Sequence, residues 1–194
     1  MNANQFFLQQ YGDLQSMINE FVLKGLTDEQ MRCPPEVGFN SLVWLLWHTA
    51  RCQDFAMRVV GVQNEELLDD DWLERMNIDR RDLGTGMTPE ECAAFDVQVD
   101  MDGVRAYWAA VRQRVKTVAC SLPPAEWETA PDDGRLQEAF SDGVMGTERA
   151  RWLESFFAGK TRAWWLSFTV WHSAVNLLGN ATCVRRLKGI PLGQ

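Results

Sequence analysis

The sequence predicts an all-α protein built as a four-helix bundle, and three observations lead to this prediction. Four long segments carry apolar side chains at the three- and four-residue spacing of an amphipathic helix. No segment alternates apolar and polar residues strongly enough to indicate a strand. Helices of roughly 20 residues are ~30 Å long, which matches the dimensions of such bundles. We therefore expect one domain over residues 1–194.

The first two long helices are predicted over residues 4–24 and from just after Asn40 to about Val60. The first helix has an apolar stripe that is expected to be buried: Phe7, Tyr11, Leu14, Ile18, Phe21 and Val22. A short helical turn is expected over 27–32. Asn40 is the expected N-cap of the second helix, and Gly61 is expected to end it. Most of the circumference of this helix is apolar, so we expect it deep in the bundle.

The connection between the second and third helices, residues 63–99, is long and acidic. It is expected to contain a short helix within 65–76 and a second one that starts at Thr88 and Pro89. Residues 65–102 include thirteen acidic and three basic side chains. A connection of this length can traverse the bundle, so a simple up-down-up-down order is not required.

The third helix is predicted to start after Asp100, a good N-cap, and to end before Pro123. The stretch 123–146 is rich in Pro, Asp and Gly and is expected to be mainly loop. The fourth helical pattern covers 147–187, with an interruption at Gly159 and its main part from 161 to 188.

Composition argues against several classes of protein. The net charge is −8 and no basic stripe is present, so we expect no nucleic-acid partner. No apolar run reaches the ~20 residues that span a bilayer, so we expect no membrane contact. The N-terminus lacks the basic and apolar regions of a secretory signal. Five cysteines without close pairing suit a reducing cytoplasm better than disulfides or a zinc knuckle.

Both histidines of the chain stand in strongly apolar segments. His48 follows Trp44 by one helical turn and precedes Cys52 by another, so the three share a face. His172 precedes Asn176 by one turn. If the two helices face each other, these side chains could converge on a ligand. They could equally be hydrogen-bonded core residues, with Cys52 packed as a small hydrophobe, because both spacings are weak motifs.

Four segments resemble one known family. They are "FNSLVWLLWHTARCQDF", "LERMNIDRRDLGTGMT", "TRAWWLSFTVWHSAV" and "LGNATCVRRLKG". On these segments the chain is similar to the DinB/YfiT-like superfamily, whose members include thiol-dependent S-transferases and mycothiol-dependent isomerases. The resemblance implies an up-down-down-up bundle and a homodimer.

The resemblance also implies a site for a divalent metal ion. Members of the family bind the ion through three histidines, one on the second helix and an H-x-x-x-H pair on the fourth. His48 and His172 match two of these positions, and Asn176 stands where the third histidine is expected. An amide oxygen is a weaker ligand than imidazole for zinc, nickel or iron, although a Cys52 thiolate could compensate. Three alternatives follow: an altered metal site, a metal-free pocket, or two core histidines.

The function that the resemblance implies is that of a metal-dependent transferase or isomerase using a low-molecular-weight thiol. The metal ion would act as a Lewis acid. Cys52, Trp44 and Trp165 are the candidates for contacts with the thiol cofactor, and Phe168 could extend the apolar wall. These aromatic residues could equally be core packing.

Two arginines are candidates for the carboxylate of a thiol at the mouth of the site. They are Arg51 and Arg162, although arginines on helices are usually just solvated. The alternative function is a non-catalytic binding or scaffold bundle that has lost the metal. In either case the expected partners are a small-molecule ligand or thiol and a second copy of the chain.

Overall fold

The computed structural model describes residues 1–36, 38–61 and 65–193. This part of the chain contains helices, turns and loops but no strand, so the all-α prediction is confirmed. None of its helices is long and apolar enough to cross a membrane. The described residues leave out Gln63 and Asn64, at the start of the expected crossover, and Gln194, at the end of the expected domain.

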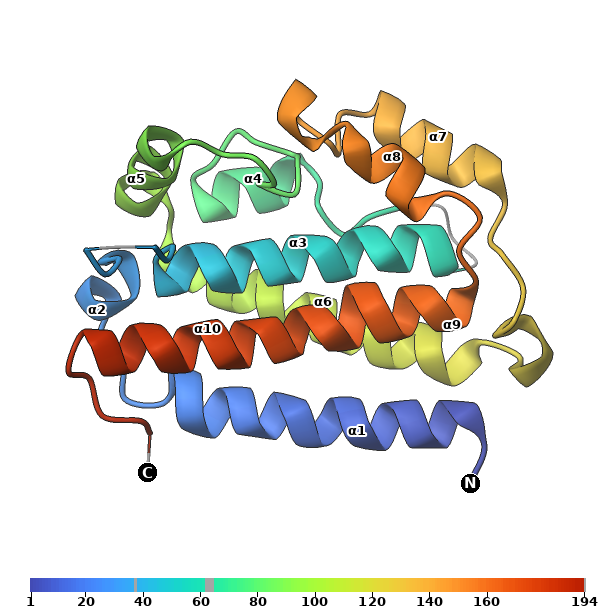
Figure 1. The fold of residues 1–194 in the computed structure, drawn as a ribbon, viewed down its shortest axis with the longest axis horizontal. Coiled ribbons are helices and arrows are strands. Elements are labelled where there is room, and N and C mark those ends of the chain that lie inside the picture. Colours follow the sequence, from blue (N-terminus) through green and yellow to red (C-terminus); the bar gives the residue numbers. More distant parts are fainter. Residues whose placement is uncertain (37, 62–64, 194) are drawn as a thin grey trace.

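Four long helical segments lie side by side and form the body of the molecule (Figure 1). The first is α1 with a π-helix that continues it, the second is α3 and the third is α6. The fourth begins as α9, continues as a second π-helix and ends as α10. Their bounds are α1 Ala3–Met17, the first π-helix Ile18–Leu23, α3 Leu42–Val60, α6 Met101–Ser121, α9 Arg162–Trp164, the second π-helix Trp165–His172 and α10 Ser173–Leu187.

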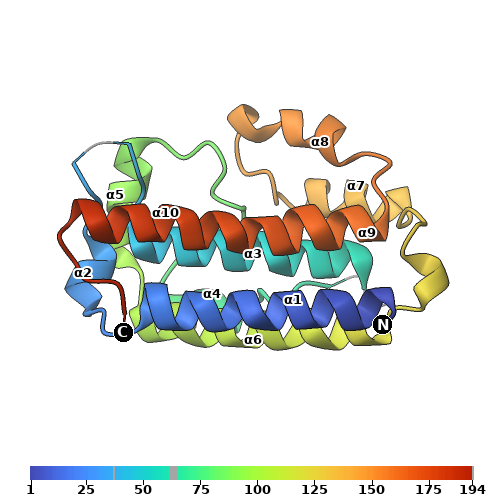
Figure 2. The ribbon, with the colours of Figure 1, turned by 60° about the horizontal axis from the view of Figure 1, so that its bottom comes forward.

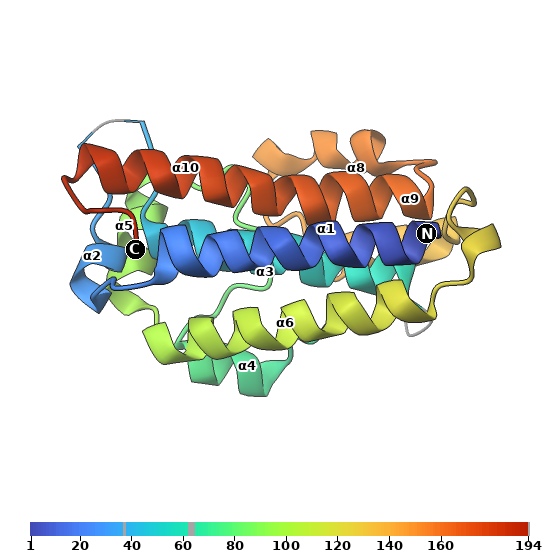
Figure 3. The same cartoon turned by 90° about the horizontal axis from the view of Figure 1, so that it is seen from below.

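The helices pack around one apolar core. Both α3 and α1 contact α6 and α10, and this square arrangement is visible from two further directions (Figures 2 and 3). The helix α3 is buried over most of its circumference, as its sequence predicts. In Figure 1, α3 and α6 both start at the end of the molecule where α1 and α10 end. The crossover between α3 and α6 therefore travels back along the length of the bundle.

Local capping signals position the short helices. Thr27 caps α2 (Asp28–Arg32), and Thr88 forms a capping box with α5 (Pro89–Gln98). Asp69 caps α4 (Asp70–Met76), and Asp100 caps α6, as predicted. The N-cap of α3 is Ser41 and not Asn40, because the Ser41 side chain accepts the Trp44 backbone N–H.

The first long helix departs from its predicted pattern near its end. Phe21, expected in the core, is 43% exposed. It lies in the first π-helix, whose wider turn shifts side chains away from the positions of a regular 3.6-residue period.

The segment 123–146, which was expected to be mainly loop, contains a short 3₁₀ helix and the helix α7 (Asp133–Ser141). Asp132 caps α7, and only Leu136 and Ala139 of this helix are buried, so its apolar pattern is too short to recognise. The next helix, α8 (Trp152–Phe157), lies beside α7 and above α3 in Figure 1. Gly159, at φ 66°, separates α8 from α9, which confirms the predicted interruption.

A buried ionic network ties the crossover to α3. The Arg51 side chain is fully buried and donates hydrogen bonds to the Glu66 carboxylate at 2.6 Å and to the Arg81 carbonyl at 2.7 Å. It also contacts the Tyr107 hydroxyl at 3.0 Å, and this hydroxyl donates to Asp54 at 2.7 Å. The expectation that Arg51 lies at the mouth of a site is therefore wrong. Its guanidinium instead holds the crossover in place.

Candidate functional site

The candidate site begins with His48, which α3 presents toward the crossover. Its Nδ1 lies 2.5 Å from the Leu83 carbonyl oxygen, which can only accept, so Nδ1 carries a proton and donates it. The ring stacks on Trp44, with centroids 4.6 Å apart and planes 15° from parallel. Both contacts fix the ring, and they leave Nε2 as the nitrogen that is free to accept a proton or bind a ligand.

Cys52 lies one turn further along α3, with its Sγ 3.7 Å from His48 Nε2. Burial disfavours the charged imidazole, but Cys52, the Leu83 carbonyl and Asp82 together outweigh burial and raise the pKa of His48 above its usual value. His48 therefore holds a proton more readily than a free imidazole does.

The second side of the site comes from the fourth long segment. The His172 ring is exposed and stacks on Phe168, with centroids 5.0 Å apart. The Asn176 amide Nδ2 lies 3.5 Å from His172 Nδ1. Phe168 and His172 belong to the second π-helix, a form of helix that often occurs at functional sites.

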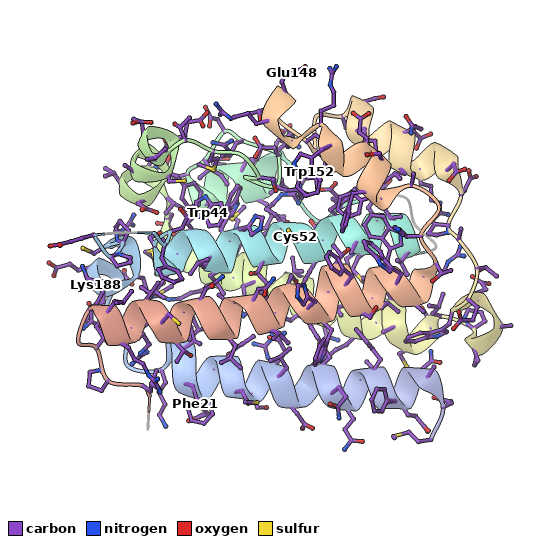
Figure 4. All side chains as sticks on the ribbon, viewed as in Figure 1. Phe21, Trp44, Cys52, Glu148, Trp152 and Lys188 are labelled. Carbon is purple, nitrogen blue, oxygen red and sulfur yellow. The ribbon has the colours of Figure 1, made fainter. Side chains whose placement is uncertain are left out.

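These side chains line one pocket of about 220 Å³ between α3, the crossover, α8 and the fourth segment. Figure 4 shows Cys52 on α3 below Trp152 of α8. The polar lining consists of His48, Cys52, Thr85, Thr169, His172, Ser173 and Asn176. The apolar lining consists of Leu83, Trp152, Leu153, Phe156, Phe157 and Phe168. The pocket is thus an apolar recess with polar groups on two of its sides.

The structure brings together four of the six candidate site residues. His48, Cys52, His172 and Asn176 line the same pocket. Trp44 and Trp165 are buried and lie behind the pocket walls. Trp44 supports the His48 ring, and Trp165 stacks on the wall residue Phe157 at 4.7 Å.

Arg162, the second arginine considered for the mouth of the site, binds elsewhere. Its guanidinium donates to the Thr129 hydroxyl at 2.8 Å and to the Ala130 carbonyl at 3.1 Å. It therefore anchors the loop before α7 and does not face the pocket.

Three features of the site were not predicted from the sequence. The Leu83 carbonyl fixes the His48 ring, α8 supplies Trp152 and Phe156 to the wall, and Thr169 belongs to the lining although its hydroxyl oxygen is buried. The apolar run "WLESFF" indicated a buried face for α8 but not its position. No sequence signal distinguishes Thr169 from other helical threonines.

The donors in the pocket can be compared with the needs of a metal ion. Zinc binds sulfur at ~2.3 Å and nitrogen at ~2.0–2.1 Å, so a tetrahedral site separates these two donors by ~3.6 Å. The observed Cys52 Sγ–His48 Nε2 distance of 3.7 Å is close to this value, but Sγ also lies 4.0 Å from Nδ1 and is therefore off the direction of the Nε2 lone pair. The Cys52 side chain would have to rotate before both atoms could bind one ion. The donation from His48 Nδ1 to a carbonyl is also usual for a metal-binding histidine. Among the described residues, however, no group of three His, Cys, Asp or Glu side chains is already placed to hold an ion.

Comparisons with known proteins identify the family. A crystal structure of a conserved protein from Enterococcus faecalis is similar to this chain, with a TM-score of 0.71 and 23% sequence identity. The match covers 96% of this chain and 97% of that chain, and at this identity it indicates a shared fold. No curated protein matches. The family model of the DinB superfamily matches residues 13–178, which is most of the chain. The chain therefore belongs to the DinB superfamily.

Proposed function

We propose that the pocket binds a divalent transition metal ion, zinc, nickel or iron, and that the protein uses it with a low-molecular-weight thiol in a transfer or isomerisation reaction. The observation that carries the proposal is that His48, Cys52, His172 and Asn176, from two separate helical segments, line one pocket. Imidazole nitrogen and thiolate sulfur are good ligands for these ions.

His172 and Asn176 provide the second half of the proposed ligand set. The 3.5 Å between His172 Nδ1 and the Asn176 amide is close to the ~3.4 Å expected between nitrogen and oxygen ligands of one tetrahedral ion. Rotation of the amide about its last bond would present Oδ1 at this point. Binding would then require the pairs on α3 and on the fourth segment to move toward each other.

The residues of the chain have separate roles in this proposal. A bound ion would lower the pKa of a thiol or water at an open position and so supply a nucleophile at neutral pH. The Leu83 carbonyl keeps the His48 ring in one orientation. Phe156, Phe157 and Phe168 form an apolar wall on one side of the pocket.

The test is metal analysis of tag-free protein and of variants of each donor. We expect near-stoichiometric metal in the parent protein and at least a tenfold loss of affinity in His48→Ala, His172→Ala and Cys52→Ser. Cys120→Ser, which removes an exposed thiol on α6, is the matched control and should keep the metal. A parent protein that binds none of the three ions after incubation would refute the proposal.

The second candidate is a non-catalytic binding protein. Two observations favour it: an amide stands at one expected ligand position, and the described residues contain no ready-made three-donor group. The same metal analysis distinguishes the two functions. A non-catalytic binding protein would contain no metal, and chelators would not change its properties. The cytoplasm is the expected location in both cases, with no nucleic-acid or membrane partner.

We also infer that the four long helices follow an up-down-down-up order and that the protein is a homodimer. The helix directions in Figure 1 and the length of the crossover support this order. Light scattering coupled to size-exclusion chromatography tests the dimer, for which a mass of about twice 22.2 kDa is expected.

A further inference from the structure

A second pocket, of about 460 Å³, lies between the loop that precedes α3 and the helix α5. In Figure 1, α5 lies above the first turns of α3, and the two helices are in contact. The volume is within the ~300–1,000 Å³ of small-molecule sites. This pocket shares no lining residue with the pocket around His48.

The described lining of the second pocket is part apolar and part polar. The apolar part consists of Pro34, Pro35, Gly38, Phe39, Met87, Pro89 and Ala93. The polar part consists of Glu36, Asn40, Ser41, Cys92 and Asp96. None of these residues is Lys, Arg or His, so the lining carries only negative charge.

Asp96 supplies the buried charge of this pocket and is only 5% exposed. The Ser41 hydroxyl donates to Asp96 Oδ1 at 2.5 Å, and Ser41 is itself fixed because its oxygen accepts the Trp44 backbone N–H at 3.0 Å. Asp96 Oδ2 has no hydrogen-bond partner among the described residues, and protein atoms do not enclose it. The carboxylate is therefore held through one oxygen and presents the other to the pocket.

No basic side chain of the described residues forms an ion pair with this carboxylate. The Arg32 guanidinium donates to the Asp96 backbone carbonyl at 2.6 Å and not to the side chain. Burial raises the pKa of Asp96 to about 6, although the Ser41 hydrogen bond and the Arg32 charge oppose this shift, so the carboxylate is mostly ionised at neutral pH. A buried charge is costly unless it is paired. The free oxygen therefore indicates a ligand with a positive charge and an N–H donor.

The other walls limit the kind of cation. Proline rings have no backbone N–H to donate, so Pro35 and Pro89 offer apolar surface, as does the side chain of Met87. A calcium ion needs six to eight oxygen ligands, and no group of three His, Cys, Asp or Glu side chains is placed to hold an ion within the described ranges. One carboxylate beside an apolar wall suits an organic ammonium with a short aliphatic chain.

We propose that this pocket binds the primary ammonium group of an alkylamine. The ammonium donates a hydrogen bond to Asp96 Oδ2, and the alkyl chain packs on Pro35, Pro89 and Met87. A hydrogen bond between charged groups is stronger than one between neutral groups, so the charge of the ligand decides its affinity. The inference goes beyond the proposed metal-dependent function and does not depend on it, because the two pockets share no residue.

The test is an NMR titration of the ¹⁵N-labelled, chelator-treated full chain at neutral pH and constant ionic strength. The probes are n-butylamine, 1-butanol and butyrate, which share a four-carbon skeleton and differ in charge. We expect n-butylamine to bind with a Kd at least tenfold lower than that of 1-butanol, and butyrate not to bind. The shifted backbone amides should centre on Ser41, Cys92 and Asp96. Equal affinities for n-butylamine and 1-butanol would overturn the proposal.

Asp96→Asn removes the charge and keeps the shape of the side chain. The Kd of n-butylamine should rise at least tenfold in this variant, whereas that of 1-butanol should stay within twofold. Glu90→Gln is the matched control, because Glu90 is an exposed carboxylate of the same helix that does not line the pocket. An unchanged affinity for n-butylamine in Asp96→Asn would refute the role of the carboxylate and with it the proposal.

A second variant tests the pocket without changing the carboxylate. Ala93→Phe places a large ring in the lining and should weaken the binding of n-butylamine at least tenfold. Ala94→Phe is the matched control, because Ala94 is the next residue of α5 and lies outside the lining. Both alanines are exposed, so both variants should fold. Full binding by Ala93→Phe would place the amine elsewhere and overturn the proposal.

An alkylammonium group can belong to a free amine or to a lysine side chain of another protein. Nα-acetyl-lysine methylamide distinguishes these sources in the same titration. Binding as tight as that of n-butylamine supports a lysine side chain as the ligand, and binding at least tenfold weaker supports a free amine. The metal analysis of the His48 pocket and this titration report on different residues, so either proposal can fail without the other.

Discussion

Arg51 is predicted to be the side chain whose loss most disturbs both the fold and the site. In Arg51→Met the guanidinium is removed from a fully buried position, and the Asp54 and Glu66 carboxylates lose the cation they share. Breaking a buried ion pair by removing one partner costs about 3–5 kcal/mol, because an uncompensated charge stays buried. For a chain of this size, 1 kcal/mol corresponds to ~2–4 °C in Tm, so we expect a decrease of ~6–20 °C.

The assays are thermal unfolding, which gives Tm, and urea unfolding, which gives the free energy of unfolding, both followed by tryptophan fluorescence with Arg105→Met as the matched control. Arg105 pairs with Asp28 and Asp102 on the surface, where a pair is worth about 0–1 kcal/mol. Arg51 also binds the Arg81 carbonyl, two residues before Leu83, so its loss should loosen the carbonyl that orients His48. A destabilisation of Arg51→Met no larger than that of Arg105→Met would refute the reasoning.

Three further predictions concern the crossover and the helices around it. Burial raises the pKa of Asp96 to about 6, although the Ser41 hydrogen bond opposes this shift. Between pH 4 and 6 the folded state therefore binds more protons than the unfolded state. As the pH rises from 4 to 7, the free energy of unfolding of the parent protein should fall by about 2–3 kcal/mol relative to that of Asp96→Asn. Gly103→Ala should destabilise by several kcal/mol, since its Cβ would lie 2.2 Å from the Arg75 carbonyl oxygen. Gly179→Ala should stabilise α10 by up to ~1 kcal/mol, because nothing lies within 4 Å of the added Cβ.

All three can be measured by chemical denaturation. Asp102→Asn, at an exposed carboxylate, is the control for the pH series, and a parallel pH dependence in parent and Asp96→Asn would contradict the first prediction. The two glycine variants serve as controls for each other, since both add one methyl group within a helix. Equal effects would show that the contact between Gly103 and α4 is not tight.

Helix starts and ends that are set by residues close in the sequence could be predicted from the sequence. Thr88 and Pro89 start α5, Asp100 caps α6 and Gly61 ends α3, as their residue types indicate. These signals are hydrogen bonds within one turn and backbone preferences of single residues, so they need no distant partner. The helix α7 escaped prediction because it buries only Leu136 and Ala139, so its apolar pattern is too short to recognise.

One part of the candidate site could likewise be predicted from the sequence, and another part could not. The four-residue spacing of His48 and Cys52 places them on one face of α3, and this proximity follows from the sequence alone. Their meeting with His172 and Asn176 depends on the packing of α3 against the fourth segment. The position of Arg51 was misjudged because its partner Glu66 comes from the crossover and its partner Tyr107 from α6.

The sequence by itself determined the helical class, most helix boundaries and the Cys52–His48 pair, because periodicity and capping act over four or five residues. Only the tertiary structure decided that the Leu83 carbonyl orients His48 and that α8 forms a wall of the pocket. These features depend on which apolar faces are buried against each other, and that choice is made by the whole core at once.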